Sequence, residues 1–148
     1  MRDLAIVYWS ATGNTEAMAA AVAEGARSTG AQVRLMTAAE ASPDQLAACD
    51  GIAFGCPAMG AEQLEETEFE PLFSACEGQL NGKALALFGS YGWGGGEWMS
   101  SWEARCTEAG ARLVCPSVIC CETPDQDTLA ACRSLGAALG AALGAALG

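Results

Sequence analysis

The chain has 148 residues, of which 51% are hydrophobic and 17% charged, and its 18 acidic and 7 basic side chains give a formal net charge of −11. This length suits one domain, residues 1–148, with a core of its own. The acidic balance argues against non-specific binding to nucleic acid or to an anionic membrane. The chain has no His, which excludes a Ser-His-Asp triad, a Cys-His pair and a His-ligated metal.

Apolar runs and helix-forming segments alternate along the chain. Strands are predicted, in chain order, at 4–9, 31–36, 52–55, 83–89 and 113–121, and helices at 17–26, 43–49, 69–80, 98–109 and from 125 onward. Five strands alternating with helices predict an α/β fold with a doubly wound, five-stranded parallel sheet.

The last residues, 136–148, are a low-complexity repeat of Gly, Ala and Leu. Each glycine costs about 1 kcal/mol relative to Ala in a helix interior. We therefore expect the last helix to fray into a tail here. Small residues every fourth position leave pairing between chains open, but we expect a monomer.

Eight cysteines occur without any CxxC spacing, which excludes a zinc ribbon and a thioredoxin-type site. The apolar run at 4–9 is too short for a signal peptide or a membrane span. We expect free thiols acting as small apolar side chains in a cytoplasmic protein. Cys120 and Cys121 point to opposite faces of a strand and cannot chelate together, so no metal site is predicted.

The loop after the first strand carries hydroxyl and amide side chains around a turn glycine, Ser10-Ala11-Thr12-Gly13-Asn14-Thr15, directly before a helix. A helix N-terminus offers free N–H groups and a positive dipole end, so this loop predicts a phosphate cradle of neutral donors. The simpler alternative is that Asn14 or Thr15 only caps the helix. No Lys follows Gly13, which excludes a nucleotide-hydrolysing P-loop.

Two further loops follow the third and fourth strands, at the same predicted edge of the sheet. Tyr91 and Trp93 stand among glycines, which favours a flat platform for an aromatic ligand. Met59 can cover the opposite face with its thioether. The alternative for Trp93 is a buried loop anchor. Together the three loops predict a mononucleotide site.

Three segments resemble the short-chain flavodoxins: IVYWSATGNT at 6–15, CPAMG with the acidic stretch that follows it at 56–71, and ALFGSYGWGGGEW at 86–98. The resemblance extends from Met1 to about Gly136. It implies a flavodoxin-like sheet of order 2-1-3-4-5 and a tightly but non-covalently bound FMN. It also implies a low-potential one-electron carrier that cycles between semiquinone and hydroquinone and shuttles electrons between redox proteins, not an enzyme.

The resemblance also assigns residues to the cofactor. The phosphate ligands are Ser10, Thr12, Asn14 and Thr15, with backbone N–H groups of Ala11 and Gly13. Met59 and Trp93 cover the two faces of the ring, Glu62 accepts from its N3–H, and the carbonyl of Gly60 turns toward N5. The remaining contacts are Pro57, Ala58, Ser90, Tyr91, Gly92 and Gly94.

Ala61 departs from the family, which often has Asp, Asn, Ser or Gly at this position. A type II turn over residues 59–62 needs positive φ at Ala61, which costs Ala about 1 kcal/mol. If the oxidised protein adopts that turn, Ala61 makes the first reduction step easier.

The segment from Leu35 to Gly82 has no basic residue and the acids 40, 44, 50, 62, 65, 66, 68, 70 and 77. We expect six of these carboxylates to disfavour a second negative charge on the flavin by up to about 2 kcal/mol before salt screening. The same surface is expected to steer basic faces of redox partner proteins. The alternative is a solvated helix face that only aids solubility.

Two other functions share this pocket. A flavin-dependent reductase of small molecules needs a substrate cavity over the ring, a space that Trp93 is expected to close. A non-redox FMN-binding module needs no switchable contact such as that at Gly60.

Overall fold

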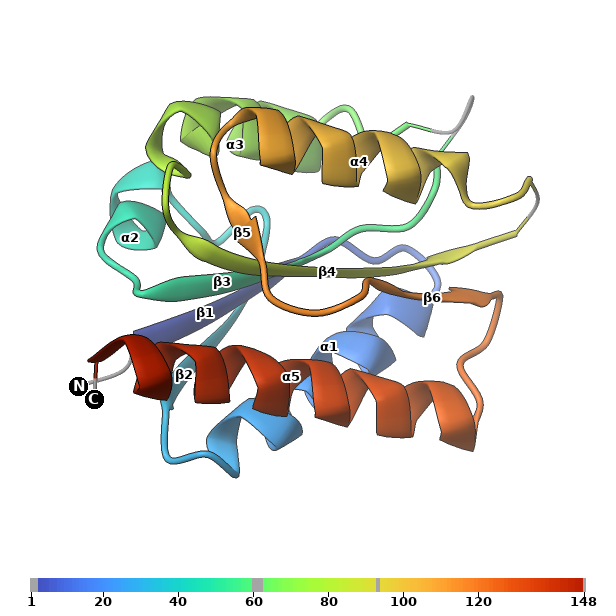
Figure 1. The fold of residues 1–148 in the computed structure, drawn as a ribbon. Helices are drawn as coiled ribbons and strands as arrows, with labels where there is room; N and C mark the ends of the chain where they lie inside the picture. Colours follow the sequence, from blue (N-terminus) through green and yellow to red (C-terminus); the bar gives the residue numbers. More distant parts are fainter. Residues whose placement is uncertain (1–2, 60–62, 93, 148) are drawn as a thin grey trace.

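The computed structural model describes residues 3–59, 63–92 and 94–147. A parallel sheet forms the centre, with helices on both faces (Figure 1). Its strands are β1 (Asp3–Tyr8), β2 (Gln32–Thr37), β3 (Gly51–Gly55), β4 (Ala84–Tyr91), β5 (Arg112–Leu113) and β6 (Val118–Cys121). The helices are α1 (Asn14–Arg27), α2 (Pro43–Ala47), α3 (Phe69–Cys76) with a 3₁₀ turn η1 (Glu77–Gln79), α4 (Glu97–Glu108) and α5 (Gln126–Leu147). The strand order β2-β1-β3-β4-β5 confirms the predicted topology.

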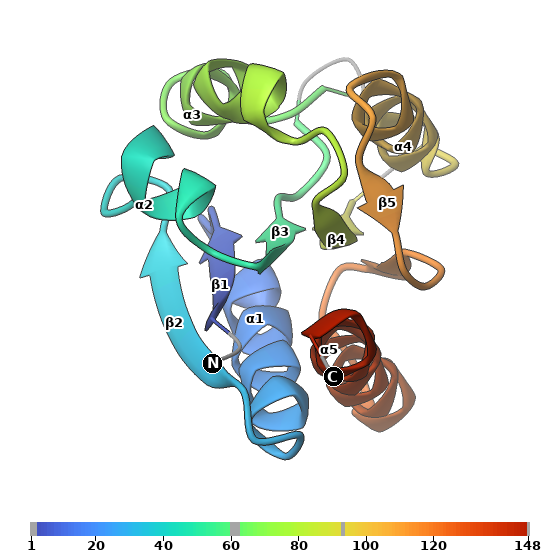
Figure 2. The same cartoon turned by 60° about the vertical axis from the view of Figure 1, so that its left-hand side comes forward.

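The two faces of the sheet are covered by different helices. Figure 2 shows α1 and α5 on one face and α2, α3 and α4 on the other. Successive strand residues point to opposite faces, so Val7 of β1 belongs to one core and Ile6 to the other. Strands β1, β3 and β4 are buried on both faces, which explains why they read as continuous apolar runs.

The fifth strand, predicted as one run over 113–121, is interrupted. β5 pairs with the beginning of β4, and β6 pairs with the end of β4. Pro116 lies between the two pieces and has no N–H to donate to the sheet. Both pieces therefore lie beside β4, and the single predicted strand is corrected to two short ones.

The prediction of a frayed C-terminal tail is wrong, because α5 continues through Leu147. Leu135, Leu139 and Leu143 are buried against the sheet and α1. Gly136 lies so close to α1 that an added Cβ would meet the backbone oxygen of Val22 at 2.0 Å. The glycines thus lower helix propensity but allow two helix backbones to approach, and packing decides the outcome.

All eight cysteines lie in the described part of the chain and are free thiols. Burial raises the pKa of Cys56, Cys106 and Cys132 to about 12, so these thiols stay protonated at neutral pH. None of the described helices is long and apolar enough to cross a bilayer.

Candidate functional site

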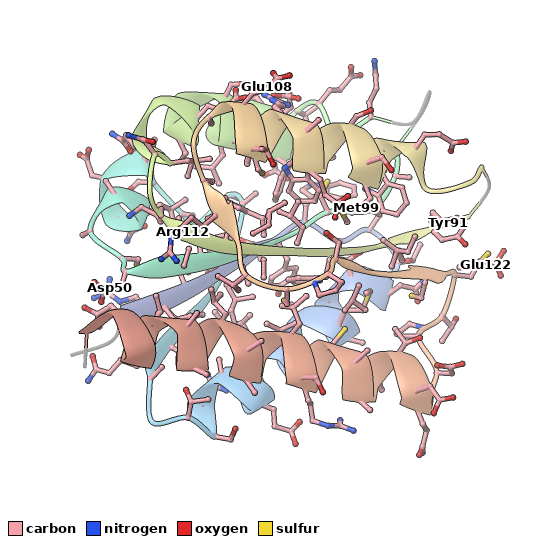
Figure 3. The ribbon with its side chains drawn as sticks, in the orientation of Figure 1. Asp50, Tyr91, Met99, Glu108, Arg112 and Glu122 are labelled. Atoms are coloured by element: carbon pink, nitrogen blue, oxygen red, sulfur yellow. The ribbon has the colours of Figure 1, made fainter. Side chains whose placement is uncertain are left out.

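A hollow of about 250 Å³ lies at the carboxyl edge of the sheet, where open α/β sheets bind ligands. Figure 3 shows Tyr91 and Glu122 at this end of the sheet and Asp50 and Arg112 at the opposite end. The hollow is lined by Trp9, Ser10, Ala11, Thr12, Asn14, Thr15, Pro57, Ala58, Met59, Ser90, Tyr91, Gly92 and Glu122. The structure therefore brings together predicted residues from all three loops.

Three predicted residues, Gly60, Glu62 and Trp93, lie outside the described part of the chain, as does Ala61. Gly13 lines an adjoining hollow with Ser10 and Ala11. Gly94 is exposed and is not among the described lining residues.

The loop after β1 leaves the start of α1 open to a ligand. Gly13 occupies the N-cap position with φ of 94°, a conformation that L side chains rarely adopt, and no side chain caps the helix. The N–H of Gly13 donates to Ser10 Oγ at 3.1 Å. Thr15 Oγ1 instead lies 3.2 Å from Ser90 Oγ. The alternative in which Asn14 or Thr15 merely caps the helix is therefore not what the structure shows.

The electrostatics of this end come from neutral donors. No Lys or Arg lies among the described lining residues, and Glu122 is the one charged side chain there. The first N–H groups of α1 have no partners within the helix and carry the positive end of its dipole. An anion at this point would be held by backbone N–H groups and hydroxyls, not by a counter-ion.

The loop after β3 has a fixed base. The Ala58 N–H donates to the Ser90 carbonyl at 3.0 Å, which ties this loop to the end of β4. Met59 and Gln63 form an antiparallel bridge through two backbone hydrogen bonds of 2.8 and 2.9 Å. The predicted switch at Gly60 lies outside the described residues, in the segment that follows Met59.

Glu65 anchors the segment that follows this bridge. Its carboxylate is buried and accepts backbone N–H donors from Thr67 at 2.9 Å, Glu68 at 2.7 Å and Phe69 at 2.9 Å, as well as the Thr67 hydroxyl. Burial alone would raise the pKa of Glu65, but these hydrogen bonds lower it below its ordinary value. The Glu65 N–H donates to Cys56 Sγ at 3.3 Å.

The acidic stretch is therefore not a uniform field. Glu65 serves as the anchor, and Glu70 pairs with Arg105 at 2.5 Å. Glu66 and Glu68 are exposed. Of these four carboxylates, Glu70 forms an ion pair, whereas Glu66 and Glu68 are exposed. The expected sum over six carboxylates stays a prediction.

Two lining residues, Trp9 and Glu122, were not predicted. The Trp9 indole N–H donates to Glu68 Oε1 at 3.0 Å and links the first loop to the start of α3. Glu122 has φ of 61°, the one positive value at a non-glycine residue in the described ranges, and its N–H donates to the Tyr91 carbonyl at 2.7 Å. Both follow the carboxyl end of a strand, and that position was a usable signal, since strained residues concentrate at functional sites.

The chain is similar to known flavodoxins in sequence and in fold. The sequence profile described as Flavodoxin matches residues 6–136. A Megasphaera elsdenii flavodoxin is 44% identical over 133 residues, covering 90% of this chain and 95% of the relative. A Clostridium beijerinckii flavodoxin is 44% identical over 121 residues, covering 82% and 88%. The solution structure of two-electron reduced Megasphaera elsdenii flavodoxin superposes with a TM-score of 0.85 at 43% identity, covering 93% of this chain and 98% of that one.

Proposed function

This chain belongs to the flavodoxin family, FMN-binding electron-transfer proteins that are not enzymes, and from this premise we propose that the hollow between the three loops holds the FMN. The observation that carries the proposal is the uncapped start of α1, with Gly13 at its N-cap, which opens onto the same hollow as Met59 and Tyr91. One end offers anion donors, and the other offers apolar and aromatic walls.

The residues present fit the two halves of this cofactor. FMN supplies one-electron redox chemistry when it is bound. The chain binds the phosphate through Ser10, Thr12 and the first N–H groups of α1, and it orients the ring between the loops after β3 and β4. Met59 and Tyr91 exclude water from the ring, which makes a negative charge on it less favourable.

The phosphate half is tested with Thr12→Val, which removes an exposed hydroxyl at nearly constant shape. We expect FMN to bind about tenfold more weakly, as for one lost hydrogen bond to a charged group, and riboflavin, which lacks the phosphate, to bind as before. Quenching of flavin fluorescence measures both affinities. Equal losses for the two flavins would contradict the placement of the phosphate.

We also propose that this protein is a cytoplasmic, single-domain monomer that docks on basic faces of its redox partners. Glu66 and Glu68 are exposed in the segment that follows the Met59–Gln63 bridge, and Glu122 is exposed at the hollow. The net charge of −11 attracts basic surfaces at long range. These carboxylates lie near the proposed ring, so attraction would bring a partner to the redox edge.

The docking proposal predicts a position-dependent charge effect. Glu66→Lys should slow electron transfer to a basic c-type cytochrome several-fold at low salt, because it removes attraction at the redox edge. Glu108→Lys makes the same change in net charge at the far end of α4 and should slow the reaction less. Stopped-flow rates at low and high salt measure both. Equal slowing by the two variants would leave only a net-charge effect and contradict the docking face.

A further inference from the structure

Trp98, near the start of α4, contacts both loops that form the proposed ring site. Its indole is 2% exposed, and its Nε1–H donates to the carbonyl of Cys56 at 3.1 Å. Its ring also packs against Tyr91 with centroids 5.6 Å apart at 52°. Cys56 directly precedes the lining residues Pro57, Ala58 and Met59, and Tyr91, also a lining residue, ends β4 where the other loop begins.

Gly89 of β4 leaves room for the contact between Trp98 and Cys56. A Cβ on Gly89 of β4 would meet the Cys56 oxygen at 2.2 Å and Trp98 Cζ2 at 3.2 Å. Glycine at this position therefore allows the carbonyl and the indole to meet above the strand. Cys56 has a second contact, because its Sγ accepts a hydrogen bond from the backbone N–H of Glu65. Cys56 is thus held by Trp98 of α4 and by Glu65.

We propose that Trp98 is a positioning residue of the flavin site: it fixes the spacing between the loops at 56–59 and 90–92 before the flavin binds. This proposal rests on the placement of FMN in the hollow. We call the contacts of Trp98 with Cys56 and Tyr91 the clamp. A loop that is already held loses less conformational freedom when a ligand binds, so the clamp should increase the affinity for flavin. A looser pocket also admits water, which stabilises a charged reduced ring, so weakening the clamp should raise the lower of the two one-electron potentials.

Trp102 provides a matched control one helical turn away. It is also on α4 and 2% exposed, and it packs against Phe69 and Phe73 with ring centroids 5.4 and 5.9 Å apart. Its buried Nε1–H has no hydrogen-bond partner among the described residues. Trp98→Phe and Trp102→Phe therefore remove the same atoms from the same helix, but only the first removes a hydrogen bond to a loop of the site.

The test measures FMN and riboflavin affinity, both one-electron potentials and the free energy of unfolding for the wild type and the two variants. We expect Trp98→Phe to weaken both flavins equally, by about tenfold, and to raise the lower potential. Trp102→Phe should change affinity by less than about twofold and leave the potentials in place. The equal loss for riboflavin separates this clamp from the phosphate loop.

Several results would overturn the proposal. Reduced stability of Trp98→Phe with wild-type affinity and potentials would make Trp98 a structural residue only, and equal effects of the two variants would show general core damage. If Trp98→Phe does not fold, hydrogen exchange of the wild-type Trp98 indole N–H decides, with its signal assigned by elimination in Trp9→Phe, Trp93→Phe and Trp102→Phe. Protection in the flavin-free protein supports preformed contacts of Trp98, and fast exchange refutes them. Failure of the wild type to bind FMN would instead refute the proposed function.

Discussion

The two faces of the sheet are packed in opposite ways. On the face of α3 and α4, large rings fill the core: Phe54, Phe73 and Trp102 contact one another with centroids 5.2 to 6.5 Å apart. On the face of α1 and α5, glycines lie where the chain makes its closest approaches. An added Cβ on Gly25 would meet the Arg133 oxygen at 1.8 Å, and one on Gly140 would meet Thr29 Oγ1 at 2.2 Å.

The difference shows two ways to pack helices on a sheet: large side chains can fill the space, or the backbones can approach each other closely. Aromatic side chains fill the core between the sheet and the helices α3 and α4. One of them, Trp98, also donates a hydrogen bond to the carbonyl of Cys56. The helices α1 and α5 approach each other closely because glycines remove the side chains between them. The aromatic face therefore contributes the contact between Trp98 and the segment that begins at Cys56, whereas the loop at residues 10–15 leads into α1 on the glycine face.

The largest expected effect comes from adding one methyl group to the glycine face. Gly136→Ala places a Cβ 2.0 Å from the Val22 oxygen, so α1 and α5 must separate. Overpacking of this kind costs about 1–3 kcal/mol, partly offset by about 1 kcal/mol of helix propensity. Because backbone atoms are in the way, we expect a net loss of about 2 kcal/mol in the free energy of unfolding by urea.

Gly78→Ala is the control for this substitution, since nothing lies within 4 Å of its added Cβ. That variant should stay within about 0.5 kcal/mol of the wild type. An unchanged or increased stability of Gly136→Ala would show that the helices are not held by backbone proximity.

The aromatic face was easier to predict from the sequence than the glycine face. Apolar runs at strand length and segments of good helix formers predicted the alternation of strands and helices and most element boundaries, whereas the strand order came from the resemblance to the flavodoxins. The C-terminal repeat was misjudged because helix propensity counts what glycine costs locally, whereas its benefit depends on a second helix more than 100 residues earlier in the chain. Pro116 was an overlooked local signal for the break between β5 and β6.

The site shows the same division between local and distant information. The residues at 10–15, 57–59 and 90–92 carry local chemistry, and all but Gly13 line the one hollow. The roles of Glu65 and Glu70 were not predictable from their run of acids, because one is set by three backbone N–H groups and the other by Arg105 on a different helix. Trp9 and Glu122 were predictable from their positions, because each directly follows the carboxyl end of a strand.

A smaller and pH-dependent effect is expected on the aromatic face. Arg105 of α4 contacts α3 and η1. Its guanidinium donates to Glu70 at 2.7 and 2.5 Å and to Glu77 at 2.7 and 3.0 Å, and it lies 4.8 Å from the centre of the Phe73 ring. These groups are about one-third exposed, so solvent screens the pairs. Arg105→Met keeps the apolar stem and should cost about 1 kcal/mol at pH 7.

The pH dependence separates this pairing from simple packing. The hydrogen bonds from Arg105 hold the pKa of Glu70 below its ordinary value of 4.5. A lowered carboxyl pKa in the folded state stabilises the protein above the unfolded pKa, and that stabilisation is lost as the pH falls through the folded value. The difference in the free energy of unfolding between the wild type and Arg105→Met should therefore be constant above about pH 5 and shrink in urea titrations at lower pH.

Arg27→Met is the control for this substitution. Arg27 is an exposed arginine of α1 on the glycine face, and its replacement should change stability by less than about 0.5 kcal/mol. A deficit of Arg105→Met that persists undiminished in acid would mean that its contact with Phe73, and not its charge, joins α3 to α4.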